Sequence, residues 1–330
     1  MSDFKTLKGL YIKHISSDPP SPIEGQIWYN TTSKTLKVSP SLTAWASGGN
    51  LNTGRLNAGC TSSGPRDASL VFGGEASPNT QVVNESYDGS SWTELGDINT
   101  GRRNIAGFGT QTAAVAAGGL IPPATPQTQD LVEEWDGSSW TEVTDVPVAG
   151  IPDASSAGTL TAGLLFGGET AGGDGHAAET YHYDGTNWTD GGDLNTARSV
   201  AGGAGTQTAA LMFGGVEPGT SDNTEEYNGT SWTNGNDMNN TTQDMGSGGI
   251  QTNAMSAGGE GGPSGDLTEL YDGTSWAAAP TLATARWGGG TTSASANTSS
   301  ILFGGLIPPF TAATEEFTAA VTTRSVDTST

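Results

Sequence analysis

The sequence predicts an all-β fold built from repeated four-stranded units, on three observations. The chain of 330 residues contains 50 glycines and 16 prolines, so few segments have the propensity to form a long helix. A Gly-Gly pair that ends a short apolar run occurs six times, and an Asp-Gly or Asn-Gly turn followed by tryptophan occurs five times. Regular spacing of such landmarks is typical of a chain that repeats one supersecondary unit.

The Gly-Gly pairs mark the repeat, whose period is about 47 residues. Apolar runs directly before the pairs, such as Leu211-Met212-Phe213, predict short buried strands. The six pairs are Gly73-Gly74, Gly118-Gly119, Gly167-Gly168, Gly214-Gly215, Gly258-Gly259 and Gly304-Gly305.

The turn motif, of the form Tyr-Asp-Gly-Ser-Ser-Trp, predicts a hairpin in each unit. Its copies lie at 87–92, 135–140, 183–188, 227–232 and 271–276, and their tryptophans are 48, 48, 44 and 44 residues apart. Asp-Gly favours a two-residue turn because both central positions need a positive φ. Each unit is then predicted to have four strands: one after Leu-Asn-Thr-Gly/Ala-Arg, one ending in Gly-Gly, one ending in Glu-x-Tyr, and one carrying the tryptophan. Four strands in about 45 residues are typical of a β-propeller blade.

The ends of the repeat predict how it closes. Trp45 precedes the first full unit as Trp92 precedes the second, whereas no tryptophan follows Phe317 in the last unit. We expect residues 45–330 to form a six-bladed ring in which the strand around Trp45 completes the blade of residues 286–318, which removes an open sheet edge.

These motifs resemble those of the kelch and galactose-oxidase-like propellers, whose blades carry Gly-Gly after the second strand, then a tyrosine and a tryptophan. The resemblance implies a six-bladed, kelch-like β-propeller over roughly residues 45–330. The chain departs from typical kelch sequences in its Ser, Thr and Ala content, and Ala117 and Ala257 replace phenylalanine before two Gly-Gly pairs.

Residues 1–44 form a separate N-terminal arm with a predicted hairpin. The arm carries all five lysines against three acids, whereas the rest has seven arginines against 32 acids. A hairpin is predicted from strands 26–30 and 35–38. The segment around Trp28-Tyr29-Asn30 resembles the start of bacteriophage virion and tail-fibre proteins, which implies attachment to other virion proteins, with Trp28 and Tyr29 as docking residues. The whole chain resembles kelch-like structural proteins of tailed phages of aquatic bacteria.

Composition excludes several functions. A net charge of -23 disfavours nucleic acid and anionic membranes as partners. We expect no membrane span and no secretory signal. With Cys60 as the single cysteine, and only His14, His176 and His182 as histidines, neither an internal disulfide nor a copper site like that of galactose oxidase is recognisable. No metal or cofactor is expected.

Four arginines are the candidate ligand-binding residues because they occupy equivalent positions before the first strand of a unit: Arg55, Arg102, Arg198 and Arg286. Sialidases are six-bladed and grip a carboxylate with an arginine trio, so convergence of these side chains would suit an acidic sugar. The alternative is that each arginine pairs with an acid or caps a turn. The repeated Asp-Gly aspartates are interpreted as turn residues, and the repeated tryptophans as packing between blades.

Two apolar loops follow the second strand of the second and sixth units. They contain Leu120 and Ile121 in one case, and Leu306, Ile307 and Phe310 in the other. An apolar pair of loops suggests docking of another subunit or of the arm, and local packing is the alternative.

From these features we expect a non-enzymatic virion protein, tail-associated or part of a fibre, that displays a propeller toward host-surface glycan. The alternatives are a capsid or tail decoration protein without a ligand, a sialidase-like glycan hydrolase, and a soluble cellular kelch scaffold. Assembly of several copies through the arm rests on analogy with fibres.

Overall fold

The computed structural model describes residues 12–17, 27–38, 43–77, 79–123, 127–171, 175–295, 299–319 and 324–326. It divides the chain into two compact units, one of Met1–Ala44 with Thr318–Thr330 and one of Trp45–Phe317. The described residues contain strands, turns and bridges but no helix, so the all-β prediction is confirmed. The division after Ala44 matches the change in composition, whereas the C-terminal residues group with the arm and not with the repeats.

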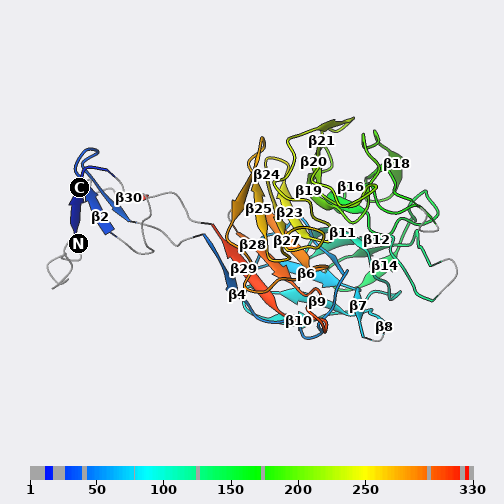
Figure 1. Ribbon diagram of the computed structural model, residues 1–330. Coiled ribbons are helices and arrows are strands. Elements are labelled where there is room, and N and C mark those ends of the chain that lie inside the picture. The colour runs from blue at the N-terminus through cyan, green and yellow to red at the C-terminus, as the bar shows by residue number, and fades with distance from the viewer. Residues whose placement is uncertain are drawn as a thin grey trace. The chain divides into compact units, whose positions relative to one another are not determined.

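The first unit is a four-stranded sheet with strands from both ends of the chain. Its order is β1 (Lys13–Ile15), β2 (Ile27–Asn30), β3 (Thr35–Val38) and β30 (Arg324–Val326), with β1 parallel to β2 (Figure 1). The predicted hairpin is β2–β3, closed by Asn30, whose Oδ1 accepts the backbone N–H groups of Thr32 and Ser33 at 3.0 Å. No sequence signal had pointed to β30, which pairs antiparallel with β3.

The second unit contains six four-stranded sheets within its described residues, one for each Gly-Gly repeat. The first has β5 (Gly59–Cys60), β6 (Ser69–Phe72), β9 (Asn84–Tyr87) and β10 (Trp92–Glu94); the second β11 (Ala106–Thr110), β12 (Ala113–Ala117), β13 (Val132–Trp135) and β14 (Trp140–Glu142); the third β15 (Ser155–Thr159), β16 (Ala162–Phe166), β17 (Thr180–Tyr183) and β18 (Trp188–Asp190). The fourth has β19 (Gly202–Thr206), β20 (Ala209–Phe213), β21 (Thr224–Tyr227) and β22 (Trp232–Asn234); the fifth β23 (Gly246–Ile250), β24 (Asn253–Ala257), β25 (Thr268–Tyr271) and β26 (Trp276–Ala279); the sixth β27 (Gly290–Ser295), β28 (Ser299–Phe303), β29 (Thr314–Thr318) and β4 (Ala44–Ser47). A short ribbon of β7 (Glu75–Ala76) and β8 (Asn79–Thr80) extends from the first.

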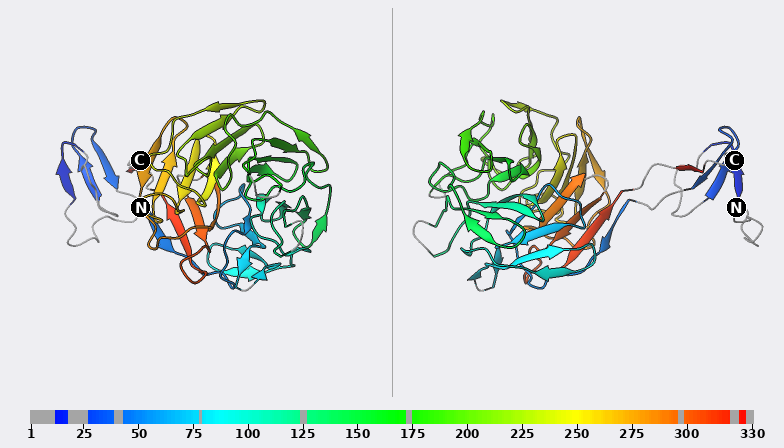
Figure 2. Two further views of the ribbon diagram at one scale, coloured as in Figure 1. Left: turned by 45° about the vertical axis from the view of Figure 1, so that its right-hand side comes forward. Right: turned by 180° about the vertical axis from the view of Figure 1, so that it is seen from behind.

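These sheets are arranged about a common centre (Figure 2). The first strand of each sheet contacts the first strand of the next, in the order β5, β11, β15, β19, β23 and β27, and β27 also contacts β5. Repeated four-stranded antiparallel sheets in this arrangement are consistent with a β-propeller.

The sixth sheet takes its outer strand from the beginning of the repeat region. β4 lies beside β29, where the N–H of Gly48 donates to the carbonyl of Thr314 at 2.9 Å. The rings of Trp45 and Phe317 lie 5.2 Å apart, in the same tilted arrangement as the rings of Tyr87 and Trp92 in the first sheet. Trp45 therefore occupies the position that the tryptophan after the Asp-Gly turn holds in the other sheets.

The apolar core lies between neighbouring sheets. Phe72 of the first sheet packs on Trp140 of the second, with ring centroids 4.7 Å apart, and Phe303 of the sixth packs on Trp92 of the first at 4.8 Å. Both phenylalanines are almost fully buried, which contributes about 2–3 kcal/mol for each side chain. The interpretation of the repeated tryptophans as packing residues is confirmed.

Polar contacts on the third strand differ from one sheet junction to the next. At four junctions a tyrosine hydroxyl contacts a polar side chain of the preceding sheet: Tyr87 with Glu316, Tyr183 with Glu134, Tyr271 with Glu226 and Tyr227 with His182, at 2.5–2.8 Å. At the other two, the hydroxyl and the partner are both missing, because Trp135 and Phe317 replace tyrosine while Ser86 and Leu270 replace the acid. The two sides of a junction are thus matched in chemistry.

The aspartates of the Asp-Gly motif serve as turn residues, as interpreted from the sequence, but the predicted two-residue turn is wrong. Tyr87 pairs with Trp92, so the loop between the strands has four residues, and of Asp88 and Gly89 only the glycine has a positive φ. Oδ1 of Asp88 accepts the backbone N–H groups of Ser90 and Ser91 at 2.8 Å, and Asp136 does the same in the second sheet. Donation from Ser91 and Ser90 lowers the pKa of Asp88 to about 2. These carboxylates serve turn geometry.

The Gly-Gly pairs allow one repeat to bond to the next. Gly74 has a φ of 90°, and its N–H donates to the carbonyl of Arg102 in the following repeat at 2.9 Å. A Cβ at Gly74 would lie 2.8 Å from the carbonyl oxygen of Leu56, so a larger residue would push the strands apart. The same bond links the last repeat to the first, from Gly305 to Arg55 at 2.8 Å.

Candidate functional site

Six residues, one from each repeat, form a ring at the centre of the second unit, here called the central ring. Each has a φ between 51° and 67°, and each backbone N–H donates to the carbonyl of the equivalent residue in the preceding repeat at 2.8–3.3 Å. Gly288 donates to Asp244 and Asn57 donates to Gly288, so the cycle of bonds has no gap. The six residues are Asn57, Asn104, Asp153, Val200, Asp244 and Gly288. Because their backbone N–H groups are occupied, any hydrogen bond that these residues donate to a ligand has to come from a side chain.

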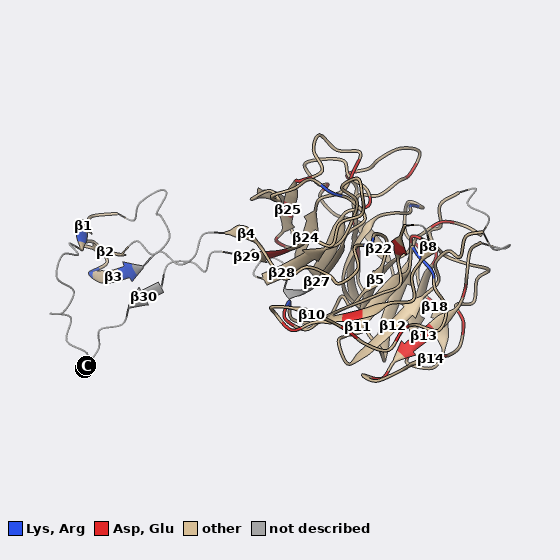
Figure 3. Cartoon of the chain, turned by 90° about the horizontal axis from the view of Figure 1, so that it is seen from below, with Lys and Arg blue, Asp and Glu red and all other residues tan. Residues whose placement is uncertain are grey.

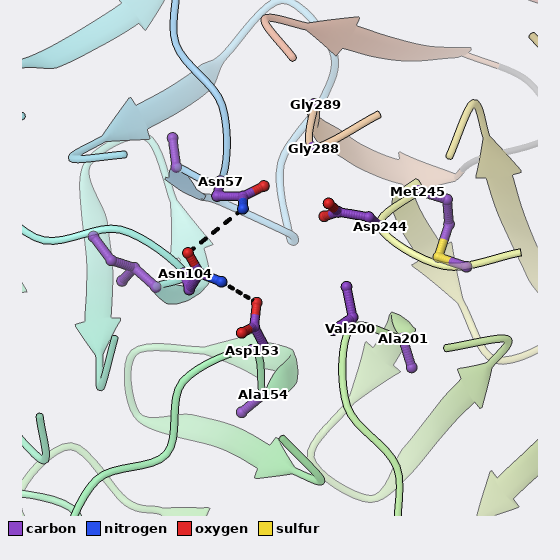
Figure 4. Close-up of a pocket in the computed structure, with 12 residues that line it drawn as sticks. Asn57, Asn104, Asp153, Ala154, Val200, Ala201, Asp244, Met245, Gly288 and Gly289 are labelled. Atoms are coloured by element: carbon purple, nitrogen blue, oxygen red, sulfur yellow. Dashed lines mark hydrogen bonds between the residues drawn. The ribbon is translucent and has the colours of Figure 1, made fainter. Parts of the chain in front are cut away.

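The central ring surrounds a cavity of about 120 Å³ (Figure 4). Asn57 donates from Nδ2 to Oδ1 of Asn104 at 3.5 Å, and Nδ2 of Asn104 donates to Oδ1 of Asp153. Oδ1 of Asn57 is buried without a hydrogen-bond partner, and no described residue donates to the side chain of Asp244. The cavity therefore presents hydrogen-bond acceptors that the protein does not use.

Burial makes the two carboxylates of this cavity weak acids. Desolvation raises the pKa of Asp153 to about 7, with Glu169 and Asp244 adding to the rise, while the bond from Asn104 opposes it. Desolvation also raises the pKa of Asp244 to about 7, with a smaller contribution from Glu260. Near neutral pH each group can donate or accept a hydrogen bond, depending on its protonation.

The surroundings of the cavity are acidic. A glutamate follows the Gly-Gly pair in three repeats, as Glu75, Glu169 and Glu260. The backbone of each glutamate is hydrogen-bonded to the residue just before a member of the central ring. Arg103 forms an ion pair with Glu75. Figure 3 shows acidic segments on this unit beside fewer basic ones, and it shows basic segments on β1 and β3 of the first unit. A neutral or cationic ligand suits this field, and an anionic ligand is repelled.

A second cavity of about 130 Å³ continues from the first and shares Ala58, Ile105 and Met245 with it. Its other lining residues are mostly small, among them Ser62 and Ser156. The inner strands thus line this second cavity mostly with small side chains.

The four candidate arginines are not brought together. Each is at most 2% exposed and forms an ion pair with a buried glutamate on the third strand of its own sheet. The pairs are Arg55–Glu85, Arg102–Glu133, Arg198–Glu225 and Arg286–Glu315. Burial lowers the pKa of Arg55, Arg102 and Arg286, and the partner glutamate opposes this. The alternative weighed above, that the arginines pair with acids, is what the structure shows.

Each arginine–glutamate pair belongs to a larger clamp. Oε2 of Glu133 accepts the backbone N–H of Asn99 at 2.7 Å and its side-chain amide at 2.8 Å, while Nη1 of Arg102 donates to the carbonyl of Leu131 at 2.8 Å. The clamp fixes the segment that enters a sheet to the third strand of that sheet. The guanidinium of the clamp is buried and bonded to protein acceptors, so it is not available to bind the carboxylate of a sugar.

The residues predicted to dock partners are partly covered. Trp28 is fully buried and Tyr29 is half-buried, with its ring 5.0 Å from His14. Leu120, Ile121, Leu306, Ile307 and Phe310 are all half-buried. Leu306 pairs with Phe310 within its loop, and Leu120 pairs with Thr128. The large apolar side chains that are most exposed among the described residues are Ile12, Ile27 and Ile250.

The central ring was not predicted, although the sequence carries a signal for it. Its members follow the arginine position by two residues, and five of the six are Asn, Asp or Gly, the residue types that most readily adopt a positive φ. Val200 is the exception. Four of them lie 14 residues before the first glycine of the Gly-Gly pair, and Asn57 and Gly288 lie 16 residues before it, so an alignment on the arginine position, not on the Gly-Gly pairs, would have placed all six in one column.

The described residues contain no group of three or more His, Cys, Asp and Glu side chains that could hold a metal ion. They also contain no helix long and apolar enough to cross a membrane. No protein-family model matches the sequence, and comparison with curated proteins finds no significant match.

Proposed function

We propose that Trp45–Phe317 is a six-bladed, kelch-like β-propeller whose ring is closed by β4. The support is the contact of β27 with β5, the unbroken cycle of bonds in the central ring, and the position of Trp45 beside Phe317. A closed ring of this kind leaves only the short outer edge of each sheet open to pairing with other chains.

We further propose a non-enzymatic structural role in a bacteriophage particle, as a tail-associated or fibre component made in the cytoplasm of the bacterial host. The first unit attaches to other virion proteins, in keeping with the resemblance of residues 1–44 to virion protein segments. Because strands from both chain ends form this unit, an attachment there would hold the propeller by both of its chain connections.

The proposed ligand is a neutral or amine-bearing glycan of the host surface, bound at the central cavity. One observation carries this proposal: side-chain amides and carboxylates with unused acceptors line a cavity in the centre of the propeller. Sugar hydroxyls are donors that suit such acceptors, and copies on one particle would add weak affinities together. The acidic surroundings and the internally paired arginines argue against the acidic sugar that a sialidase-like hydrolase would take.

The test uses the full chain and intact host cells. Fluorescently labelled protein should bind cells saturably and compete with phage adsorption. Asp244→Val, which copies Val200 at the equivalent position, should weaken binding at least tenfold, on the order of the loss of one buried polar contact. Asp88→Asn is the matched control, because Asn228 occupies that turn in the fourth sheet.

Two results would overturn parts of the proposal. Absence of binding, even by chemically multimerised protein, would favour a decoration protein without a ligand. Antibodies against the chain should label purified phage particles, and particles free of the chain would exclude a virion role.

A further inference from the structure

The fifth sheet keeps the buried glutamate of the clamp but lacks its arginine. Glu269 is 3% exposed and stands where Glu85, Glu133, Glu225 and Glu315 stand in other sheets, whereas Thr242 occupies the arginine position. No described residue forms an ion pair with Glu269. In the third sheet both charges of the clamp are absent, because Ile151 stands at the arginine position and Tyr181 at the glutamate position.

Neutral donors satisfy part of the Glu269 carboxylate. Oε2 accepts the backbone N–H of Asn239 at 2.9 Å and its side-chain amide at 2.6 Å, as in the clamps with arginine. Oε1 accepts the side-chain amide of Asn240 at 2.9 Å. These bonds supply dipoles but no positive charge, and a buried carboxylate without a countercharge is unfavourable.

A small cavity of about 10 Å³ lies beside Glu269, where the guanidinium lies in the other clamps. Its lining includes Glu269, Thr242, Gly258 and Leu267. The last two are equivalent to Gly73 and Val83, whose carbonyls accept Nη1 of Arg55 at 3.2 and 2.6 Å. The residues equivalent to those that hold a guanidinium in the first sheet therefore line this cavity, which has room for one particle the size of a water molecule.

We propose that this cavity, bounded by Glu269, Thr242, Gly258 and Leu267, binds a compact monovalent cation such as potassium or ammonium, which replaces the missing guanidinium. A carboxylate and backbone carbonyls are hard oxygen ligands suited to such an ion, and its charge compensates that of Glu269. This site is structural and separate from the central cavity, because the linings of the two cavities share no residue.

The first experiment measures thermal unfolding of the full chain at a constant ionic strength of about 0.1 M. Potassium or ammonium chloride should raise the melting temperature by about 2–6 °C relative to tetramethylammonium chloride, whose cation is too large for the cavity. Thr242→Arg places an arginine beside Glu269, as in the other clamps, and should abolish the difference in melting temperature between these salts. Glu269→Gln removes the charge and should abolish it also. An equal effect of potassium on wild type and on both variants would overturn the proposal.

A matched variant creates a second copy of the site. Arg198→Thr in the fourth sheet leaves Glu225 without its arginine, as Thr242 leaves Glu269. This variant should be less stable than wild type and more strongly stabilised by potassium. Because the variant tests the same environment in another sheet, it decides the question even if Thr242→Arg does not fold.

Diffraction gives the direct readout. Crystals grown with rubidium chloride should show anomalous scattering in the cavity beside Glu269 and none there in Thr242→Arg. Density for water alone, without anomalous signal, would overturn the proposal. Scattering confined to the central cavity would overturn it as well.

Discussion

Trp45 donates its indole N–H to Oγ1 of Thr268 at 3.1 Å, across 223 positions of the sequence. The same bond joins Trp92 to Thr314, Trp232 to Thr180 and Trp276 to Thr224, each time from the outer strand of one sheet to the third strand of the preceding one. Trp45 is thus bonded as a member of the sixth sheet, next to the fifth.

Loss of the Trp45 side chain should loosen the sixth sheet. Trp45 is half-buried, so Trp45→Ala should lower the free energy of unfolding by about 2–3 kcal/mol, below the usual cost of a fully buried aromatic residue. Trp45→Phe keeps the contact with Phe317 and loses only the hydrogen bond, at a cost of about 1 kcal/mol. Urea unfolding followed by tryptophan fluorescence checks both. Equal stability of Trp45→Ala and wild type would mean that β4 does not support the sheet.

The arginine clamps should be strongly coupled. Arg198→Ala leaves Glu225 buried without a cation and should cost about 3–5 kcal/mol. Arg198→Ile combined with Glu225→Tyr copies the pair Ile151 and Tyr181 of the third sheet, and should recover most of that loss. Urea unfolding of both single variants and the double variant gives the coupling energy. If the losses of unfolding free energy in the two single variants simply added in the double variant, the arginine and the glutamate would not be coupled, contrary to their joint replacement in the third sheet.

The junction between the second and third sheets offers a similar cycle. Tyr183→Phe removes the hydroxyl that donates to Glu134 at 2.6 Å and should cost about 1–2 kcal/mol. Adding Glu134→Leu copies the pair Phe317 and Leu270 and should restore stability. Calorimetric melting of the three variants measures this. If the double variant melted at a lower temperature than Tyr183→Phe alone, the tyrosine and the acid at a junction would not depend on each other for stability.

The central cavity should make stability depend on pH. Asp153 and Asp244 have a folded pKa of about 7, above the value near 4 of an exposed aspartate. The folded state therefore binds more protons than the unfolded state between about pH 4 and 7, and this stabilisation, complete below pH 4, is lost as pH rises through 7. Unfolding free energies measured over this range should fall with pH. Asp153→Asn with Asp244→Asn should flatten the decline, because Asn57 and Asn104 hold equivalent positions. A decline of the same slope in that double variant would assign it to other groups.

The aspartates of the Asp-Gly turns give the free energy of unfolding the opposite dependence on pH, at lower pH. The folded pKa of Asp88 and Asp136 is about 2, so their stabilisation is present above the unfolded value near 4 and is lost as pH falls through 2. The measurements above should therefore be read from pH 4 upward.

Much of the fold could be predicted because each sheet repeats strong local signals. Asp-Gly turns, Gly-Gly pairs and aromatic positions predicted the strands of each repeat. Trp45 lies before the first repeat and no tryptophan follows Phe317 in the last one, which predicted the sheet that the strand of Trp45 joins. The strand β30 could not be predicted, because its three residues, Arg324–Val326, are too few to carry a periodic pattern.

The candidate site was harder to predict for a physical reason. Equivalent arginines suggested a shared ligand, but equivalence in a repeat protein places residues in separate sheets as readily as around one centre. The residues that do meet at the centre are recognised by backbone conformation, and their side chains vary from Asn57 to Val200 and Gly288. The unpaired Glu269 could be noticed only once the ion pairs in the other sheets were known.

The way in which the chain enters and leaves the propeller has a mechanical consequence. The chain arrives through the start of β4 and departs through the end of β29, and the pairing of Trp45 with Phe317 and of Gly48 with Thr314 places both connections at the same end of two neighbouring strands. A pulling force applied through the first unit would load both strands in the same direction. Neither strand would be peeled from the other, and the tension would be shared between two covalent tethers.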